Sequence, residues 1–282
     1  MRFFDVIGTV EEPKVTYSPV NHLHKKADRP AGLAKRIARL FSLGTKNPAA
    51  VPEGVRVYAV GDIHGCLREL DRLIAAILRD SAGWPGTCHL VYVGDYIDRG
   101  PDSKGVVERL LTRQEGFTVH YLRGNHDQVL LDFLDDPGVY RSWRDFGGRE
   151  TLLSYGVVPP QFDDLSAMEK AAERFRTALP NAHLAFFENL QLSAKIGDYF
   201  FVHAGVRPGI ALDHQSAEDL LWIRDEFLAS TSDYGMVIVH GHSPTPEPVR
   251  RPNRIGIDTG AYATKRLTAV VLEGDKCRFL CS

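Results

Sequence analysis

The chain of 282 residues is long enough for one large domain or two small ones, and 44% hydrophobic residues are sufficient for a buried core. A net charge of −2 gives no overall attraction to nucleic acid, and no stretch approaches the roughly 18 apolar residues of a membrane-spanning helix. The four cysteines form no C-x-x-C pair, which favours free thiols in a reducing compartment over a disulfide framework.

Residues 1–53 differ from the rest of the chain, because they are rich in proline and show little periodicity. We expect them to form an N-terminal extension to a catalytic domain at residues 54–282. Since no apolar run typical of a secretory signal follows the first residues, a cytoplasmic location is predicted.

A short basic amphipathic helix is predicted within this extension. Leu33, Ile37, Leu40 and Phe41 recur at helical spacing, and residues 22–46 carry seven basic residues against one acid. Either its apolar face docks on the main domain, or the helix contacts an anionic surface such as lipid or an acidic partner. Deletion of residues 1–50 distinguishes the two interpretations, since lost localisation with unchanged stability would favour the second.

From Val55 onward, strands and helices alternate three times. The predicted strands cover residues 55–60, 89–93 and 117–122. The predicted helices cover residues 66–79 and 104–112, and a third begins at residue 128. A helix-opening side chain is expected at Asp102 or Ser103, whose oxygen atoms can accept from the first free N–H groups.

Residues 137–190 are less regular, and turn-forming glycines with one helix at 167–178 indicate a helical insertion. Later strands are expected at residues 199–202, 236–239, 254–257, 267–272 and 276–280, with a helix at 216–227. This order predicts an α/β (α+β) fold in which two mixed β-sheets pack as a sandwich flanked by helices.

Short polar motifs follow the predicted strands. They are GDIHG (61–65), GDYIDRG (94–100), GNHD (124–127), HAG (203–205) and HGHSP (240–244). Each motif is weak evidence alone, but open α/β sheets gather their ligand sites at the carboxyl ends of the strands. We therefore expect the motifs to meet around one site.

The first two motifs supply ligands for a divalent ion. Asp62 and His64 are two residues apart in a tight loop, and their oxygen and nitrogen atoms suit Mn²⁺, Fe or Zn²⁺. Asp95 follows the second strand and can bridge two ions by using both of its oxygens. Without the other motifs, an Asp-x-His pair would indicate only a solvated loop.

A second ion is predicted beside the first. Asn125 offers a neutral amide oxygen, and His203 with either His240 or His242 would complete the ligands. Sites with two metal ions clamp an in-line displacement at phosphorus, and a hydroxide that bridges both ions would be the nucleophile.

The leaving group needs a proton, and His126, next to Asn125, is placed to provide it. Asp98 would hold His126 in the right tautomer and raise its pKa. The phosphoryl oxygens need planar donors, which Arg99 and Arg224 offer, since guanidinium matches phosphate with two hydrogen bonds. A surface salt bridge is the alternative for each arginine.

Tyr262 also lies near enough in the predicted fold to reach a phosphate, but a core or surface role fits it equally well. The remaining histidines have no such company and are expected to be structural or exposed: His22, His24, His89, His120, His183 and His214.

Together the motifs resemble the bacterial form of the phosphoprotein phosphatases, a branch of the calcineurin-like metallophosphoesterases. The resemblance covers residues 55–272 and implies that family's fold and two divalent ions, with Mn²⁺ preferred over Fe or Zn²⁺. It implies metal ligation by Asp62, His64, Asp95, Asn125, His203 and His242. It also implies phosphate binding by Arg99, Arg224 and Asn125, and an acid pair of Asp98 and His126.

The same resemblance selects His242 over His240, because the family's ligand is the histidine directly after glycine. His240 then becomes a residue at the end of a strand. Two positions depart from the pattern: Asp127 replaces the glutamate of the eukaryotic branch, and Pro244 replaces a second histidine of the wider family.

The first functional prediction is therefore a phosphomonoester hydrolase, namely a serine/threonine protein phosphatase that acts on phosphorylated proteins or small phosphoesters. The alternative is a hydrolase of dinucleotide polyphosphates resembling diadenosine tetraphosphatase. The acid in Asp98-Arg99 resembles the protein phosphatase form and places it first. A regulatory protein with a dead site is disfavoured, because every metal-ligating residue type is present. Nucleic acid is not expected as a partner.

Overall fold

The structure is a computed structural model that describes residues 48–282, and the predicted basic helix at residues 33–41 lies outside the described residues. Val51, which precedes the expected domain boundary, is buried, and its N–H donates to the carbonyl of Gly274 at 3.0 Å. Within residues 48–282, no helix combines the length and the apolar character needed to cross a bilayer.

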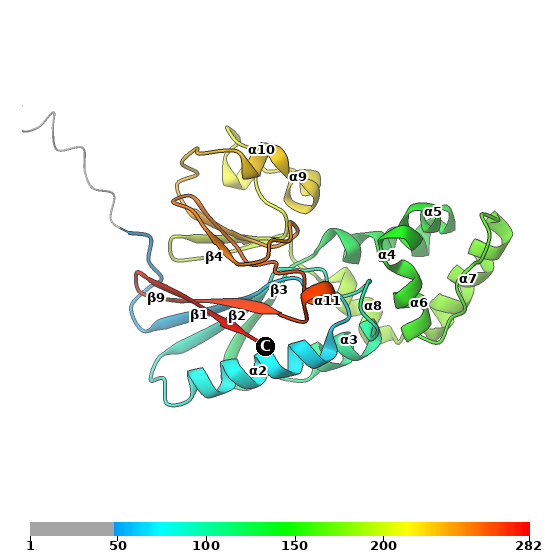
Figure 1. The fold of residues 1–282 in the computed structure, drawn as a ribbon, viewed down its shortest axis with the longest axis horizontal. Coiled ribbons are helices and arrows are strands. Elements are labelled where there is room, and N and C mark those ends of the chain that lie inside the picture. The colour runs from blue at the N-terminus through cyan, green and yellow to red at the C-terminus, as the bar shows by residue number, and fades with distance from the viewer. Residues whose placement is uncertain (1–47) are drawn as a thin grey trace, which may run out of the picture. The chain divides into compact units, whose positions relative to one another are not determined.

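Two β-sheets form the centre of the domain (Figure 1). The first has the strand order β10-β9-β1-β2-β3 and the second β4-β5-β6-β8-β7. Strands of the first sheet are β1 (Val55–Val60), β2 (Thr87–Tyr92), β3 (Phe117–Tyr121), β9 (Thr268–Glu273) and β10 (Lys276–Cys281). Strands of the second are β4 (Ser193–Ile196), β5 (Tyr199–Val202), β6 (Val237–His240), β7 (Val249–Arg250) and β8 (Arg254–Gly256).

Both sheets are mixed, as predicted. In the first, β1, β2 and β3 are parallel and β9 and β10 run antiparallel. In the second, β5, β6 and β8 are parallel, whereas β4 and β7 are antiparallel edge strands. The parallel strands of both sheets carry the motifs at their carboxyl ends.

The sheets pack face to face. Successive side chains of a strand point to opposite faces of its sheet, and in the central strands both faces are apolar. Val57 and Val91 of the first sheet share one buried cluster with Phe201 and Val239 of the second. The intervening residues of the first sheet, such as Tyr58, face the opposite way into a second cluster. The sandwich therefore has an apolar core between its sheets and another apolar layer beneath its helices.

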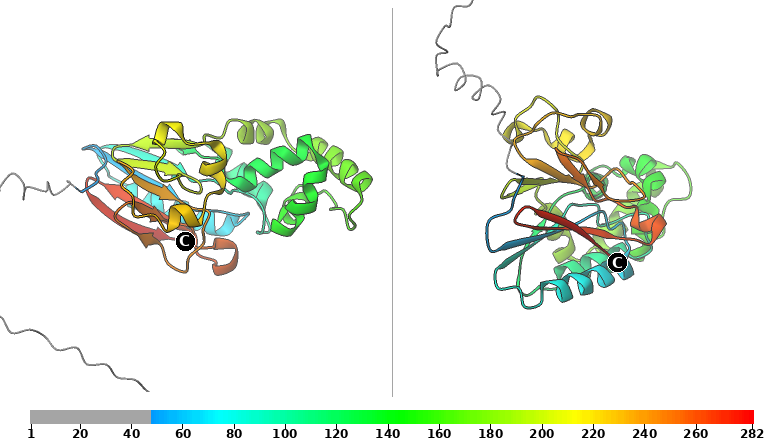
Figure 2. Two further views of the ribbon diagram at one scale, coloured as in Figure 1. Left: turned by 90° about the horizontal axis from the view of Figure 1, so that it is seen from above. Right: turned by 60° about the vertical axis from the view of Figure 1, so that its left-hand side comes forward.

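Helices cover both outer faces and one end (Figures 1 and 2). The first sheet is covered by α2 (Leu67–Ser81) and α3 (Ser103–Leu111), and the second by α9 (Ala217–Trp222) and α10 (Asp225–Leu228). The helical insertion at residues 137–190 follows α4 (Asn125–Asp135) and contains α5 (Tyr140–Trp143), α6 (Gly148–Ser154), α7 (Leu165–Ala178) and α8 (Asn181–Glu188). Both views place this insertion beyond one end of the sheets.

Short helical turns complete the chain. They are α11 (Ala261–Thr264) and three 3₁₀ turns, η1 (Pro137–Val139), η2 (Arg144–Phe146) and η3 (Leu212–His214). Asp102 opens α3 by accepting the N–H of Gly105 at 2.8 Å, which fulfils the prediction of a side-chain cap there. All four cysteines are free thiols.

One predicted helix, at residues 216–227, is in fact two. The chain leaves helical geometry between α9 and α10, where Arg224 has φ −131° and ψ −94°. This break turns the Arg224 side chain toward His242, whose carbonyl accepts from its Nη1 at 3.1 Å. The apolar periodicity of the segment continues across the break and so concealed it.

Candidate active site

The five motifs meet at the carboxyl ends of β1, β2, β3, β5 and β6. Five of their non-glycine residues adopt a left-handed backbone, with φ of 46° at His64, 53° at Asp95, 72° at Asp98, 63° at Arg99 and 62° at His242. Such angles are uncommon outside glycine and concentrate where a side chain must point in a particular direction. These tight turns at the strand ends direct the polar side chains into one place.

A first compact group consists of His64, Asp95 and His126, which are all buried. Nε2 of His64 lies 3.5 Å from one carboxylate oxygen of Asp95, and Nε2 of His126 lies 3.9 Å from the same oxygen. Each residue offers one donor atom, and these atoms lie within 4.8 Å of one another. His64 and Asp95 are thus placed to share a divalent cation, with His126 directly beside them.

A second group contains Asp95, His203 and His242, so the two groups share Asp95. Nε2 of His203 lies 3.5 Å from the second oxygen of Asp95 and 2.9 Å from Oδ1 of Asn125. Nδ1 of His242 is 2.9 Å from the same amide oxygen. Asp95 therefore directs one oxygen into each group, as a carboxylate that bridges two cations must do.

Asp62 lies beside these groups but belongs to neither of the compact sets. One of its oxygens accepts the backbone N–H of His242 at 2.9 Å. The other oxygen is buried and has no hydrogen-bond partner among the described residues, and Nε2 of His242 is buried and unpartnered in the same way. Because unpaired buried polar atoms are costly, both atoms fit a site that binds a cation.

Backbone carbonyls fix the tautomers of two histidines. Nδ1 of His64 lies 2.8 Å from the carbonyl of Ile97, and Nδ1 of His203 lies 3.0 Å from that of Val93. Each carbonyl accepts the proton of Nδ1, which leaves Nε2 unprotonated and directed into its group. Metal-binding histidines are typically oriented by such a second hydrogen bond.

Burial keeps these imidazoles neutral. It lowers the pKa of His64 to about 3 and that of His242 to about 2, and it also lowers the pKa of His203. A neutral imidazole is the form that binds a metal ion. The histidines are therefore ready to act as ligands at neutral pH.

The pKa values of the buried carboxylates are shifted in opposite directions. Burial, followed by repulsion from Asp258 and Asp95, raises the pKa of Asp62 well above its ordinary value. Burial also acts on Asp95, but attraction to the surrounding histidines, led by His203, outweighs it and holds the pKa of Asp95 well below its ordinary value. Burial raises the pKa of Asp258 to about 6. Buried carboxylates packed this closely call for a compensating positive charge.

His126 and Asp98 form a hydrogen-bonded pair, with Nδ1 of His126 2.6 Å from Oδ2 of Asp98. Burial disfavours the charged imidazole, but Asp95 and Asp98 outweigh it and raise the pKa of His126. Trp143 Nε1 donates to Oδ2 of Asp98 at 2.7 Å, and the Thr151 hydroxyl donates to Oδ1 at 2.5 Å. Two residues of the insertion thus hold Asp98 in place.

Two arginines from different parts of the chain lie beside the site. Nη2 of Arg99 lies 3.3 Å from Nε2 of His126, and its guanidinium sits 4.7 Å above the ring of Tyr262. Tyr262 in turn meets the ring of His64 edge-on at 5.5 Å. Arg224 donates to the carbonyl of His242, a member of the second group. Every residue predicted for the site is therefore brought to the same strand ends.

Sequence reasoning missed Trp143, Thr151 and Asp258 as members of the site. Trp143 and Thr151 lie in the insertion, 45 and 53 positions from Asp98, and no local pattern links them to it. Asp258 follows β8 at the same end of the sheet, and this position after a strand was the available signal. His240, the alternative ligand, is buried at the end of β6 with Nδ1 3.0 Å from the Gly241 carbonyl, outside both groups.

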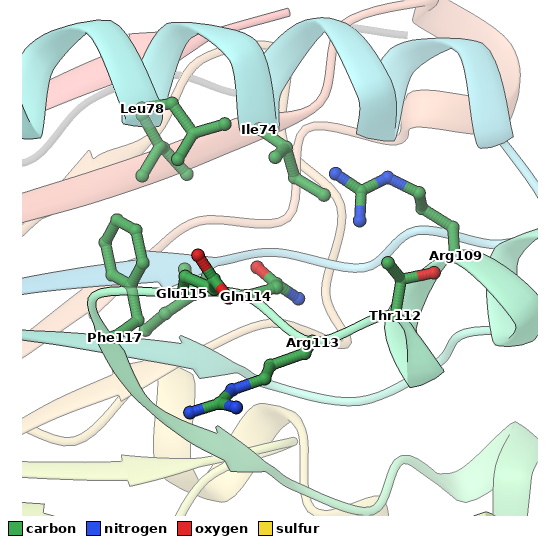
Figure 3. A pocket seen from close by; sticks show the side chains of 10 residues that line it. Ile74, Leu78, Arg109, Thr112, Arg113, Gln114, Glu115 and Phe117 are labelled. Atoms are coloured by element: carbon green, nitrogen blue, oxygen red, sulfur yellow. The ribbon is translucent and has the colours of Figure 1, made fainter.

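A separate cavity of about 410 Å³ lies at the amino end of β3, between α2 and the segment after α3 (Figure 3). Its lining is mostly apolar, with Ile74, Leu78 and Phe117 facing Arg109 and Gln114. None of its lining residues belongs to the two groups described above. The cavity is therefore distinct from the polar site at the carboxyl ends of the strands.

Comparison with known proteins finds a sequence model, described as calcineurin-like phosphoesterase, that matches residues 55–276. The chain is 28% identical over 231 residues to bis(5′-nucleosyl)-tetraphosphatase PrpE [asymmetrical] of Anoxybacillus flavithermus, covering 75% of this chain and 88% of the relative. It is 32% identical over 151 residues to the symmetrical bis(5′-nucleosyl)-tetraphosphatase of Ralstonia nicotianae, covering 54% of this chain and 42% of that relative.

Solved structures share the fold. A provisionally assigned diadenosine tetraphosphatase superposes with a TM-score of 0.53 at 23% identity, covering 83% of this chain and 98% of that one. A cold-active protein tyrosine phosphatase superposes with a TM-score of 0.52 at 18% identity, covering 82% of this chain and 81% of that one. At these identities the likeness establishes the fold alone.

Proposed function

We propose that this chain, which belongs to the calcineurin-like phosphoesterase family, is a metal-dependent hydrolase of dinucleoside tetraphosphates. The observation that carries the proposal is the likeness to the PrpE tetraphosphatase, which extends over 88% of that relative. The order of the two functions predicted from the sequence is thereby reversed. The dinucleotide hydrolase, which was the alternative, becomes the leading function.

The donor set fits a pair of divalent cations. His64 and Asp95 with Asp62 would hold one ion, and Asp95, Asn125, His203 and His242 would hold the other. Their mixture of oxygen and nitrogen atoms suits Mn²⁺, Fe or Zn²⁺, and the unpartnered atoms of Asp62 and His242 support a ligand there. When bound, such ions stabilise charge on phosphoryl oxygens and lower the pKa of water to about 7.

The remaining residues would bind the substrate and manage its protons. Arg99 lies beside His126 and Arg224 beside His242, and each would hold phosphoryl oxygens of the polyphosphate through paired N–H donors. His126, held by Asp98, would give its proton to the bridging oxygen that departs with the leaving nucleotide. Water supplies the oxygen that ends on the phosphoryl group under attack, so one water is consumed for each bond cleaved.

A second candidate is the serine/threonine protein phosphatase that the sequence placed first. The Asp98–His126 pair favours it, because a serine alkoxide needs a proton far more than a departing phosphate does. Phosphate groups bearing one ester have a second pKa of about 6, whereas an alkoxide is far more basic. Trp143 and Thr151 hold Asp98 in place, and Asp98 orients His126 as a buried acid. Cleavage of an anhydride does not require so elaborate a proton donor.

A direct comparison of substrates tests the proposal. The protein, reconstituted with Mn²⁺, is assayed side by side on diadenosine tetraphosphate and on phosphoserine and phosphothreonine peptides. The proposal expects the dinucleotide to have the higher kcat/KM by at least about tenfold. A preference for the phosphopeptides of that size would establish the second candidate in its place.

A further inference from the structure

We propose that two exposed aromatic side chains, Phe146 and Trp222, form the surfaces on which the bases of a dinucleoside polyphosphate stack. This inference rests on the proposed function and names the part of the substrate that the metal groups and arginines do not reach. It concerns binding and specificity rather than the chemical step.

Both side chains are unusually exposed for large aromatic residues. Phe146 is 57% exposed and Trp222 46% exposed. Trp222 stands between buried neighbours, since Leu221 and Ile223 are only 4% and 8% exposed. Large apolar groups left in water beside a polar site are typical of places where a ligand binds.

Contacts on both sides tie Trp222 to the second metal group. Two residues before it, the carbonyl of Leu220 accepts the N–H of Ala204, the residue after His203, at 2.9 Å. Two residues after it, Arg224 donates to the carbonyl of His242 at 3.1 Å. Since two residues span at most about 7 Å of chain, Trp222 is confined to the neighbourhood of these ligands.

Phe146 is tied to the other side of the site in the same way. Three residues before it, Trp143 donates to the carboxylate of Asp98. Directly after it, Gly147 packs so closely on Arg99 that a Cβ there would lie 2.3 Å from the backbone nitrogen of Arg99. Phe146 therefore projects from the short segment that touches both Asp98 and Arg99.

The arrangement pairs one aromatic ring with each phosphate-binding arginine. Arg99 with Phe146 lies on the insertion side, and Arg224 with Trp222 lies on the side of α9, which covers the second sheet (Figure 1). A nucleotide presents the same combination of an anionic phosphate and a flat aromatic base. Bases stack on aromatic side chains without regard to sequence, because every base has an aromatic face.

Single alanine variants test this inference in the Mn²⁺-loaded full chain. Phe146→Ala and Trp222→Ala are each expected to raise KM for diadenosine tetraphosphate roughly tenfold, since stacking contributes substantially for each base. The rise for inorganic tripolyphosphate, which has no base, is expected to be at least about fivefold smaller. Phe146→Tyr and Trp222→Phe keep an aromatic face and should restore most of the loss.

Phe162→Ala is the matched control. Phe162 is 75% exposed and precedes α7, outside the segments that touch the site. Phe162→Ala should change KM for neither substrate. The inference is wrong if Phe146→Ala and Trp222→Ala raise KM equally for both substrates, or leave KM for the dinucleotide unchanged.

Direct binding separates failure of this inference from failure of the proposed function. Should the protein turn over no dinucleotide, the proposed function fails, and calorimetric binding of adenosine monophosphate against inorganic phosphate decides the stacking question. A loss of affinity confined to the nucleotide in the alanine variants supports the aromatic surfaces. Equal losses for nucleotide and phosphate overturn them.

Discussion

Nδ1 of His126 lies 2.6 Å from Oδ2 of Asp98, and Asp98 is itself held by Trp143 and Thr151. The pair places a proton donor beside Asp95, at the centre of both groups of ligands. Its orientation depends on the insertion, because both supporting donors come from there.

Replacement of Asp98 by Asn should slow the reaction according to the leaving group. The pKa of His126 is raised by Asp95 and Asp98 against the effect of burial, so loss of the Asp98 charge lowers it. A lower pKa leaves less of the acid protonated, and the alkaline limb of the kcat profile should move to lower pH. We expect kcat for an alkyl phosphate to fall about 100-fold, with a much smaller loss for 4-nitrophenyl phosphate.

The exposed carboxylate of Asp145 provides the control for this variant. Asp145→Asn should leave kcat for both substrates and the pH profile of kcat unchanged. Equal losses for good and poor leaving groups in Asp98→Asn would contradict the role of His126 as the acid.

Asp127 should prove essential to the metal site although it binds no metal in the proposed arrangement. Its buried carboxylate accepts the backbone N–H groups of Gly124, Asp95 and Tyr96 at 2.8–3.1 Å. Asp127→Ala leaves three donors unpaired, at roughly 1–3 kcal/mol for each, and frees the Asp95 loop. We expect a loss of at least about 3 kcal/mol in unfolding free energy and weaker Mn²⁺ binding by calorimetry.

Asp132→Ala removes an exposed acid of the same helix, whose side chain accepts from Gln128, and serves as the comparison. Similar Mn²⁺ affinities in the two variants would show that Asp127 does not order the Asp95 loop.

Two glycines of the insertion separate backbone strain from steric contact. Gly147 and Gly156 both have positive φ, of 107° and 77°. A Cβ at Gly156 would meet nothing within 4 Å, whereas one at Gly147 would collide with Arg99. Gly156→Ala should cost only about 1–2 kcal/mol of stability with normal kinetics. Gly147→Ala should in addition lower kcat/KM by displacing Arg99, and equal kinetics in both variants would exclude that contact.

The metal-free protein should lose stability as the pH falls below about 6.5, the ordinary pKa of histidine. Burial lowers the folded-state pKa of His64, His89, His120, His183, His203, His240 and His242. The unfolded chain therefore binds more protons in this range, and acid favours it. His126, Asp62, Asp127 and Asp258, whose folded-state pKa values are raised, act in the opposite sense but are fewer than these seven histidines.

Urea unfolding at pH 7.5 and pH 5.5 after treatment with a chelator measures this effect. His89→Gln should reduce the difference between the two midpoints, because His89 lies away from the metal groups, with Nδ1 3.1 Å from Nε2 of His120. A midpoint that rises on acidification would contradict the prediction.

Much of the fold was predictable because its strands are short apolar runs that end in conspicuous polar motifs. The run from Val55 to Val60 is a strand with the predicted ends, and Asp95 and His203 follow strands as expected. The edge strands β4 and β7 were missed, because they have only four and two residues and carry polar side chains. The helix expected from Gln128 begins at Asn125, since the Asp127 carboxylate accepts the N–H of Gly124, the residue before the helix.

The residues that support the site could not be predicted from the sequence. Trp143 and Thr151 contact Asp98 only because the insertion folds back on the strand ends. The break at Arg224 was concealed by apolar residues on both sides of it. The choice between substrates also depends on surfaces outside the motifs, and the motifs alone placed the protein phosphatase first.

The central claim is that carboxylates, imidazoles and one amide from five strand ends hold two cations through a shared Asp95. A crystal grown with Mn²⁺ and measured at the manganese absorption edge tests it most directly. We predict two anomalous peaks roughly 3.5–4 Å apart, one beside His64 and one beside His203, with Asp95 in contact with both. A single peak, or manganese bound away from Asp95, would contradict the account.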